Sequence, residues 1–189
     1  MRNLRVELNL QHASLSDWDF FYVDTWEIYP TVQLDVDFFI SEPCSLFTGH
    51  DREEVYAMPK WASMQNLKAG RITTWLRAQA AGAGSAYIYI GIRGIASRGI
   101  RLRPTQANNV WFRNRFTWWQ GLNVLDEPAT LVLHEVEDAG VWGVPALTYH
   151  DPMLPGMNRV GIGSTPQSSG YWRWWDNTII EEWINEPCY

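Results

Sequence analysis

The densest group of residues that could recognise a ligand is the run Trp111–Trp119, where aromatic and basic side chains alternate. If this run is a β-strand, Trp111, Arg113, Arg115 and Trp119 project from one face and the intervening residues from the other. Tryptophan stacks on the C–H faces of sugar rings, and arginine binds hydroxyl and carboxylate groups. The same combination suits a protein partner. The structural alternative is that the indoles simply fill the core.

A second aromatic cluster lies at residues 171–175. Trp172 and Trp174 fall on one face of a predicted strand, and Tyr171, Arg173 and Trp175 fall on the other. Both faces are too apolar to be fully exposed to water. Either the strand is buried on both sides or one side meets a partner chain.

The sign of the charge changes twice along the chain. Residues 1–54 hold 11 acidic and 3 basic side chains, residues 55–125 hold 10 basic and no acidic ones, and residues 126–189 hold 10 acidic and 2 basic ones. Arginine and glutamate could pair across neighbouring strands, at about 0.2–1 kcal/mol per pair. Alternatively, a basic patch that includes Arg101 and Arg103 could meet the acidic patch of another copy, or an anionic glycan.

Catalytic and metal-binding patterns are weak. Glu135 and Glu137 share a strand face, but a glycosidase needs two carboxylates that flank one sugar bond, and the solvated face of a hairpin is the favoured interpretation. None of the four histidines has metal or triad spacing. Asp151, Asp176 and Asn177 could ligate calcium. The alternative is turn chemistry for Asp151 and a polar pair at the start of a strand for Asp176 and Asn177. We therefore expect no catalytic residue, no cofactor and no resident metal.

The elements that must position these residues are β-strands, because apolar and polar residues alternate with a period of two. The strand predictions cover Leu4–Leu10, Val32–Ile40, Arg71–Ala78, Tyr87–Ile92, Thr130–Glu137, Val141–Tyr149 and Ile179–Ile184. Asp138–Gly140 predicts a hairpin, and Pro145 places the strand that follows at an edge or a bulge. Only Pro59–Lys68 is open to a helix or a loop. The pattern predicts an all-β, antiparallel two-sheet β-sandwich in one domain, residues 1–189, with the strand order of residues 1–69 left open.

A resemblance sharpens this prediction. The strand at Ala129–Glu137, the Asp-Pro turn at Asp151, the Gly-rich segment Arg159–Ser164 and the closing segment Tyr171–Trp183 resemble the concanavalin A-like, or LamG-like, jelly-roll superfamily, over roughly residues 70–183. The resemblance implies two antiparallel sheets packed face to face. It also implies that the first and last strands are neighbours, with Leu4–Leu10 beside Thr178–Ile184.

Three functions follow as hypotheses. Jelly rolls of this kind occur in phage particles, so the first is a non-enzymatic virion component, decorating a capsid or associated with a tail. Its expected partners are other virion proteins or copies of itself, with a host cell-surface glycan as a further candidate ligand. The second is a lectin-like carbohydrate-binding module, and the third is a polysaccharide hydrolase or lyase. Nucleic acid is an unlikely partner for a chain of net charge −6. The sequence shows neither a membrane-spanning segment nor a signal peptide, which predicts location in the virion after synthesis in the host cytoplasm. Free thiols are the favoured interpretation for Cys44 and Cys188, and a single disulfide between them is the alternative.

Overall fold

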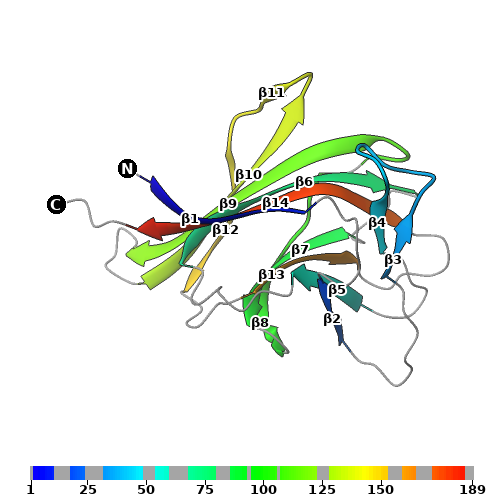
Figure 1. Cartoon of the computed structure of the whole chain (residues 1–189). Helices are drawn as coiled ribbons and strands as arrows, with labels where there is room; N and C mark the ends of the chain where they lie inside the picture. The colour runs from blue at the N-terminus through cyan, green and yellow to red at the C-terminus, as the bar shows by residue number, and fades with distance from the viewer. Residues whose placement is uncertain are drawn as a thin grey trace.

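The computed structural model describes residues 2–10, 18–23, 32–48, 54–59, 68–79, 86–92, 95–105, 107–122, 128–152, 159–164 and 172–185. Within these ranges the secondary structure consists of β-strands with no helix (Figure 1). The strands are β1 (Arg2–Leu10), β2 (Trp18–Val23), β3 (Val32–Asp35), β4 (Ser45–Thr48), β5 (Glu54–Pro59), β6 (Ala69–Ala78), β7 (Ala86–Ile92), β8 (Ile95–Leu102), β9 (Trp111–Leu122), β10 (Pro128–Asp138), β11 (Val141–Trp142), β12 (Ala146–Pro152), β13 (Arg159–Ser164) and β14 (Arg173–Asn185). No helix of the described part is long and apolar enough to cross a membrane.

The strands form two antiparallel sheets that pack face to face, as predicted (Figure 1). The large sheet has the order β11-β10-β9-β6-β14-β4-β3, with β12 also paired to β10 and β1 also paired to β14. The small sheet has the order β2-β5-β13-β7-β8. The predicted neighbourhood of the first and last strands is confirmed, since β1 pairs with β14 from Leu4 opposite Trp183 to Leu10 opposite Thr178.

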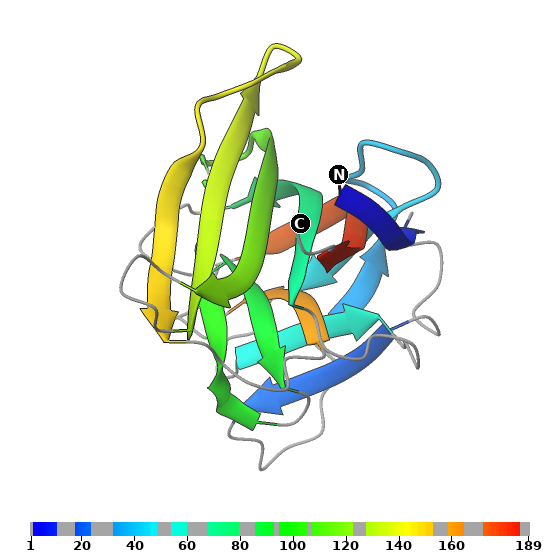
Figure 2. The ribbon, with the colours of Figure 1, turned by 90° about the vertical axis from the view of Figure 1, so that its left-hand side faces the viewer.

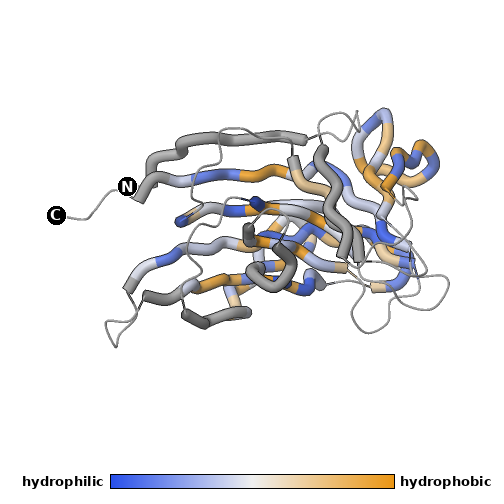
Figure 3. The backbone as a smooth tube through the Cα atoms, turned by 90° about the horizontal axis from the view of Figure 1, so that it is seen from below, coloured by the Kyte–Doolittle hydropathy of each residue, from blue (hydrophilic) through white to orange (hydrophobic). Residues whose placement is uncertain are grey.

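Hydrophilic and hydrophobic residues follow one another along the strands (Figure 3). Because successive side chains of a strand point to opposite faces, this pattern decides which of them enter the core between the sheets. On β9, Phe116 and Trp118 are fully buried, and they pack in one apolar cluster with residues of both sheets, including Ile72 of β6, Ile88 of β7 and Ile162 of β13. Removing this apolar surface from water is the main force that holds the sheets together. The odd-numbered residues of β9 consequently face away from the small sheet.

Two strand predictions need correction. The strand predicted for Val32–Ile40 ends at Asp35, because the Asp35 carboxylate accepts hydrogen bonds from the backbone N–H groups of Asp37 (2.8 Å) and Phe38 (3.1 Å) and turns the chain. The strand predicted for Val141–Tyr149 is divided into β11 and β12 around Pro145. Among its described partners, β12 pairs only with β10, across a register shift, as expected for an edge with a bulge.

The predicted hairpin after β10 is confirmed. Asp138 pairs with Val141, so the loop consists of Ala139 and Gly140. Both loop residues have positive φ, 48° and 84°, which is the conformation of the two-residue turn that matches the twist of a hairpin. The hairpin rises on one side of the large sheet, and the 36–44 loop rises on the other (Figure 2). The Pro59–Lys68 prediction lies mostly outside the described residues.

Candidate functional site

The outward face of the large sheet, between the hairpin and the 36–44 loop, carries four of the eight predicted ligand-binding residues, namely Trp111, Arg113, Arg115 and Trp119. We call it the Trp–Arg face. Its members are Trp75, Trp111, Trp119, Trp142, Trp183, Arg71, Arg77, Arg113, Arg115, Glu135, Glu137 and Glu181. The five indoles are all partly exposed. The face therefore combines open aromatic surface with charged groups.

Strand register places tryptophan and arginine opposite each other in two neighbouring rows of this face. Across β9 and β6, Trp111 lies opposite Arg77, Arg113 opposite Trp75, Arg115 opposite Thr73, and Thr117 opposite Arg71. The first two rows therefore set each tryptophan beside arginines, whereas the next two rows set each arginine opposite a threonine.

Two arginines of β9 are paired with glutamates of the neighbouring strand β10. Arg115 forms a two-pronged interaction with Glu135, with nitrogen–oxygen distances of 2.7 and 2.5 Å, and Arg113 Nη1 lies 2.8 Å from Glu137 Oε2. Bidentate arginine–carboxylate pairs are among the strongest hydrogen-bonded contacts in proteins. These pairs support the internal-pairing interpretation of the charge pattern.

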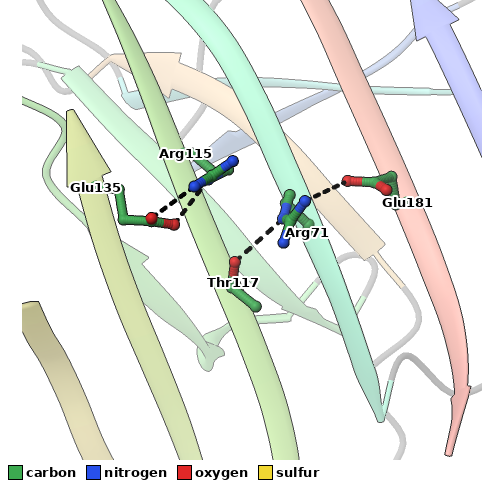
Figure 4. A network of polar contacts seen from close by, with 5 residues as sticks. All are labelled: Arg71, Arg115, Thr117, Glu135 and Glu181. Atoms are coloured by element: carbon green, nitrogen blue, oxygen red, sulfur yellow. Dashed lines mark hydrogen bonds and ion pairs between the residues drawn. The ribbon is translucent and has the colours of Figure 1, made fainter. Parts of the chain in front are cut away.

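A third pair joins the central strands of the large sheet. Arg71 of β6 lies 3.6 Å from Glu181 of β14 and donates a hydrogen bond of 3.3 Å from Nε to the Thr117 hydroxyl of β9 (Figure 4). Its guanidinium also lies 5.0 Å from the centre of the Trp183 ring. The basic strands β6 and β9 lie between the acidic strands β14 and β10, so opposite charges from distant parts of the chain meet across the sheet (Figure 4).

Trp142 of the hairpin covers the two β9 arginines. The centre of its ring lies 4.1 Å from the guanidinium carbon of Arg115 and 5.3 Å from that of Arg113. On the other side of Arg113, the ring of Trp75 lies at 5.9 Å. Such cation–π contacts restrain the planes of the guanidinium groups. The hairpin therefore helps to fix the donors of the Trp–Arg face in place.

The second predicted cluster is divided by the structure. Trp172 is 45% exposed, whereas Trp174 is only 1% exposed, so Trp174 is part of the core of this region and not a free binding residue. Its ring packs against Phe38 at 5.1 Å and Phe47 at 5.5 Å, and the guanidinium of Arg77 lies over it at 4.6 Å. The cluster was expected either to be buried on both sides or to meet a partner chain. For Trp174 the first expectation is correct, because the chain itself covers the ring.

The 36–44 loop, which supplies that cover, is held by two carboxylates. Asp176 is fully buried and accepts hydrogen bonds from the backbone N–H groups of Ile40 (2.6 Å) and Ser41 (2.9 Å). Asp35 accepts one from the indole N–H of Trp174 at 2.7 Å. The loop therefore has a fixed position at the rim of the Trp–Arg face.

Burial also affects Arg77, which the loop partly covers. Desolvation lowers the pKa of its guanidinium, and the nearby carboxylate of Asp35 opposes that effect. Phe38 lies over the guanidinium at 4.0 Å, and Arg77 Nη2 donates a 3.4 Å hydrogen bond to the Asn109 side chain. Arg77 thus belongs to the Trp–Arg face but is shielded by aromatic rings.

The remaining predicted residues lie apart from this face. Arg101 and Arg103 follow the outward side of the small sheet, because Arg101 is opposite Tyr89 while Ile100 and Leu102 enter the core. Both arginines are exposed. The structure thus places the predicted site residues in three locations: the Trp–Arg face, the 36–44 loop end and the small sheet.

The calcium hypothesis does not find support in the strand order. Asp151 lies on β12 and Asp176 on β14, with β10, β9 and β6 between them. The oxygens of Asp176 already accept the loop N–H groups, and also that of Asn177 at 2.7 Å. The described residues contain no group of three or more His, Cys, Asp or Glu suited to a metal ion.

Glu135 and Glu137 do lie on one face, as predicted, but each is engaged by an arginine. Beneath them, His134 faces the core side, stacked on Phe116 at 4.2 Å and hydrogen-bonded to Asn114 at 2.8 Å. Burial lowers the pKa of His134, against the opposing effect of Glu135. This arrangement suits rigid recognition of a polar ligand better than proton transfer to a leaving group.

No family model and no curated protein matches this sequence. Several solved structures share its fold. The exoplasmic domain of VIP36, bound to Ca²⁺ and Man3GlcNAc, has 12% identity and a TM-score of 0.55 over 100% of this chain and 92% of that one. The carbohydrate esterase of Shiga toxin-encoding bacteriophage phi24B has 12% identity and a TM-score of 0.52 over 98% and 100%. Domain 4 of the arabinanase AbnA from Geobacillus stearothermophilus, in complex with arabinotriose, has 11% identity and a TM-score of 0.52 over 97% and 95%. The chain therefore shares with these structures an all-β, two-sheet jelly-roll fold.

Proposed function

We propose that this protein is a non-enzymatic carbohydrate-binding module that binds glycans on its Trp–Arg face. The observation that carries the proposal is the set of five partly exposed indoles around fixed arginine–glutamate pairs on one sheet face. Indoles supply stacking surface and the pairs supply hydrogen bonds, which together meet the needs of a sugar ring. The similarity in fold to proteins whose names record bound or processed carbohydrate supports it.

A glycan array followed by calorimetric titration tests this proposal. The Trp75→Ala variant should lose at least tenfold in affinity while keeping its thermal unfolding transition within a few degrees. Trp172→Ala is the matched control, because Trp172 is exposed at the other predicted cluster and outside the Trp–Arg face. If no glycan binds, or if both variants lose affinity equally, the assignment of the site is wrong.

A role in virion assembly is the second candidate. Exposed apolar side chains gather on the fixed 36–44 loop, namely Val36, Phe38 and Ile40, which are 69%, 40% and 41% exposed. Patches of this kind commonly mark protein contacts, and the fold similarity includes a phage-encoded protein. Light scattering across a range of concentrations and salt would test it. A monomer under all conditions, with no binding to particle proteins, would count against it.

A further inference from the structure

The arginines of the Trp–Arg face raise the question of which glycans it selects. Guanidinium groups often indicate an acidic ligand, because they bind carboxylates and sulfates in a bidentate manner. Here each of three guanidiniums already has a carboxylate of its own: Arg71 with Glu181, Arg113 with Glu137, and Arg115 with Glu135. We infer that the Trp–Arg face selects neutral, hydroxyl-rich glycans over acidic ones, an inference that rests on the proposed function.

The first reason is the charge balance of the face. An acidic sugar placed against Arg113 or Arg115 would bring a second negative charge beside Glu137 or Glu135. The sugar carboxylate and the glutamate would repel each other. Drawing the arginine away toward the sugar would leave the glutamate without its partner. The fourth arginine, Arg77, offers little compensation, because Phe38 and Trp174 lie against its guanidinium.

The second reason is the hydrogen-bonding capacity that remains. A guanidinium has five N–H donors and a carboxylate about four acceptor positions, so a bidentate pair uses only part of each. The Arg113–Glu137 pair, whose side chains are 31% and 13% exposed, therefore presents a donor beside an acceptor. A sugar hydroxyl both donates and accepts, so it can satisfy both groups at once without disturbing the pair.

The third reason is the spacing and rigidity of the pairs. Arg113 and Arg115 are two residues apart on β9, a distance of about 7 Å along the strand. Hydroxyl groups on two linked sugar rings can span such a distance. Trp142 lies over both guanidiniums and Trp75 lies beside Arg113, so the donors are oriented before the ligand arrives. Orientation in advance reduces the entropy lost on binding.

The experiment compares neutral and acidic ligands on the full chain. Mannan, arabinan and β-glucan oligosaccharides serve as neutral probes, and polygalacturonate, alginate and heparin fragments as acidic probes, each titrated at about 50 and about 300 mM NaCl. At least one neutral probe should bind, with an affinity that changes less than about twofold between the two salt concentrations. Acidic probes should bind at least tenfold more weakly.

The Glu135→Gln variant tests the role of the paired carboxylate, with exposed Glu42→Gln as the matched control. Removing the Glu135 charge frees Arg115, so the variant should lose several-fold in affinity for the neutral probe and gain salt-sensitive affinity for acidic probes. Glu137→Gln should act in the same direction and serves if Glu135→Gln does not fold.

Two failures can be told apart. Preferential binding of an acidic probe by the unmodified protein, weakened more than tenfold by salt, would overturn the neutral-ligand inference and leave carbohydrate binding in place. The absence of binding to every probe would overturn the proposed function itself, and the inference with it. Unchanged ligand preference in both folded Glu→Gln variants would show that the pairs do not set specificity.

Discussion

The buried carboxylate of Asp176 is the main attachment of the 36–44 loop, so its removal should have a large and specific effect. The carboxylate accepts three backbone hydrogen bonds, from Ile40 at 2.6 Å, Ser41 at 2.9 Å and Asn177 at 2.7 Å. Hydrogen bonds to a charged group contribute about 1.5–3 kcal/mol each. Three such bonds set an upper range of about 5–9 kcal/mol, part of which is recovered when the released loop is hydrated. We expect Asp176→Ala to lower the free energy of unfolding by about 3–5 kcal/mol.

Unfolding in guanidinium chloride, followed by tryptophan fluorescence, measures this loss. With a slope of about 4 kcal/mol per molar, a loss of about 4 kcal/mol lowers the midpoint by about 1 M. Asp176→Asn keeps one side-chain oxygen as an acceptor, so its midpoint should lie between those of Asp176→Ala and the unmodified protein. Asp37→Ala is the matched control, because Asp37 is exposed on the same loop and should change stability by less than about 0.5 kcal/mol.

Limited proteolysis adds a local measurement to the global one. If Asp176 holds the loop, Asp176→Ala should be cleaved within residues 36–44 well before the rest of the chain. A midpoint shift no larger than that of Asp37→Ala, together with an unchanged cleavage pattern, would refute the assignment of Asp176 as the attachment point.

Three further predictions concern packing, pH and thiol reactivity. A Cβ at Gly70 would meet the backbone oxygen of Glu181, so Gly70→Ala should destabilise the fold by at least about 2 kcal/mol, whereas Gly121→Ala, with open space around it, should change stability little in the same denaturation assay. Because burial lowers the folded-state pKa of His134 below the ordinary histidine value of about 6.5, its stabilising contribution is complete above that pH and declines as the pH falls toward the folded pKa. A pH series of unfolding curves should show this decline, and His134→Gln should abolish it. Burial raises the pKa of the Cys44 thiol, so in a Cys188→Ser background Cys44 should react with a thiol reagent only at the rate of unfolding, and immediate labelling would contradict its buried position.

Alternation along the chain was sufficient to predict the faces of individual strands. It correctly placed Arg113 and Arg115 on the outward side of β9, and the family resemblance correctly paired β1 with β14. It could not predict Trp75 or Trp142 as members of the same site. Trp75 joins the site because β6 pairs with β9, and Trp142 joins it because the hairpin after β10 brings its ring over Arg115. Both positions depend on contacts between separate strands, which the alternation within one strand does not predict.

In the 36–44 loop, the alternation predicted a strand that the structure does not have. Val36, Phe38 and Ile40 continue the alternation of β3, which is why a longer strand was predicted there. The competing interaction is local, since the Asp35 side chain binds the N–H groups that a neighbouring strand would otherwise use. The second residue that holds the loop, Asp176, is distant in the sequence and binds the loop from within a bulge of β14. The residues that hold the rim of the site were therefore not recognisable from the pattern.

The charge pattern of the chain, which first suggested two patches of opposite sign, also has a consequence for strand register. A shift of β10 by one residue relative to β9 would turn Glu135 and Glu137 toward the core, with Glu135 opposite buried Asn114 or Phe116. A shift by two residues would leave one of the two glutamates opposite a residue that is not arginine. Only the observed register satisfies both pairs and keeps the core apolar. The same glutamates that neutralise Arg113 and Arg115 thus also exclude misaligned registers of β10, so variants that remove them should loosen both ligand selection and strand alignment.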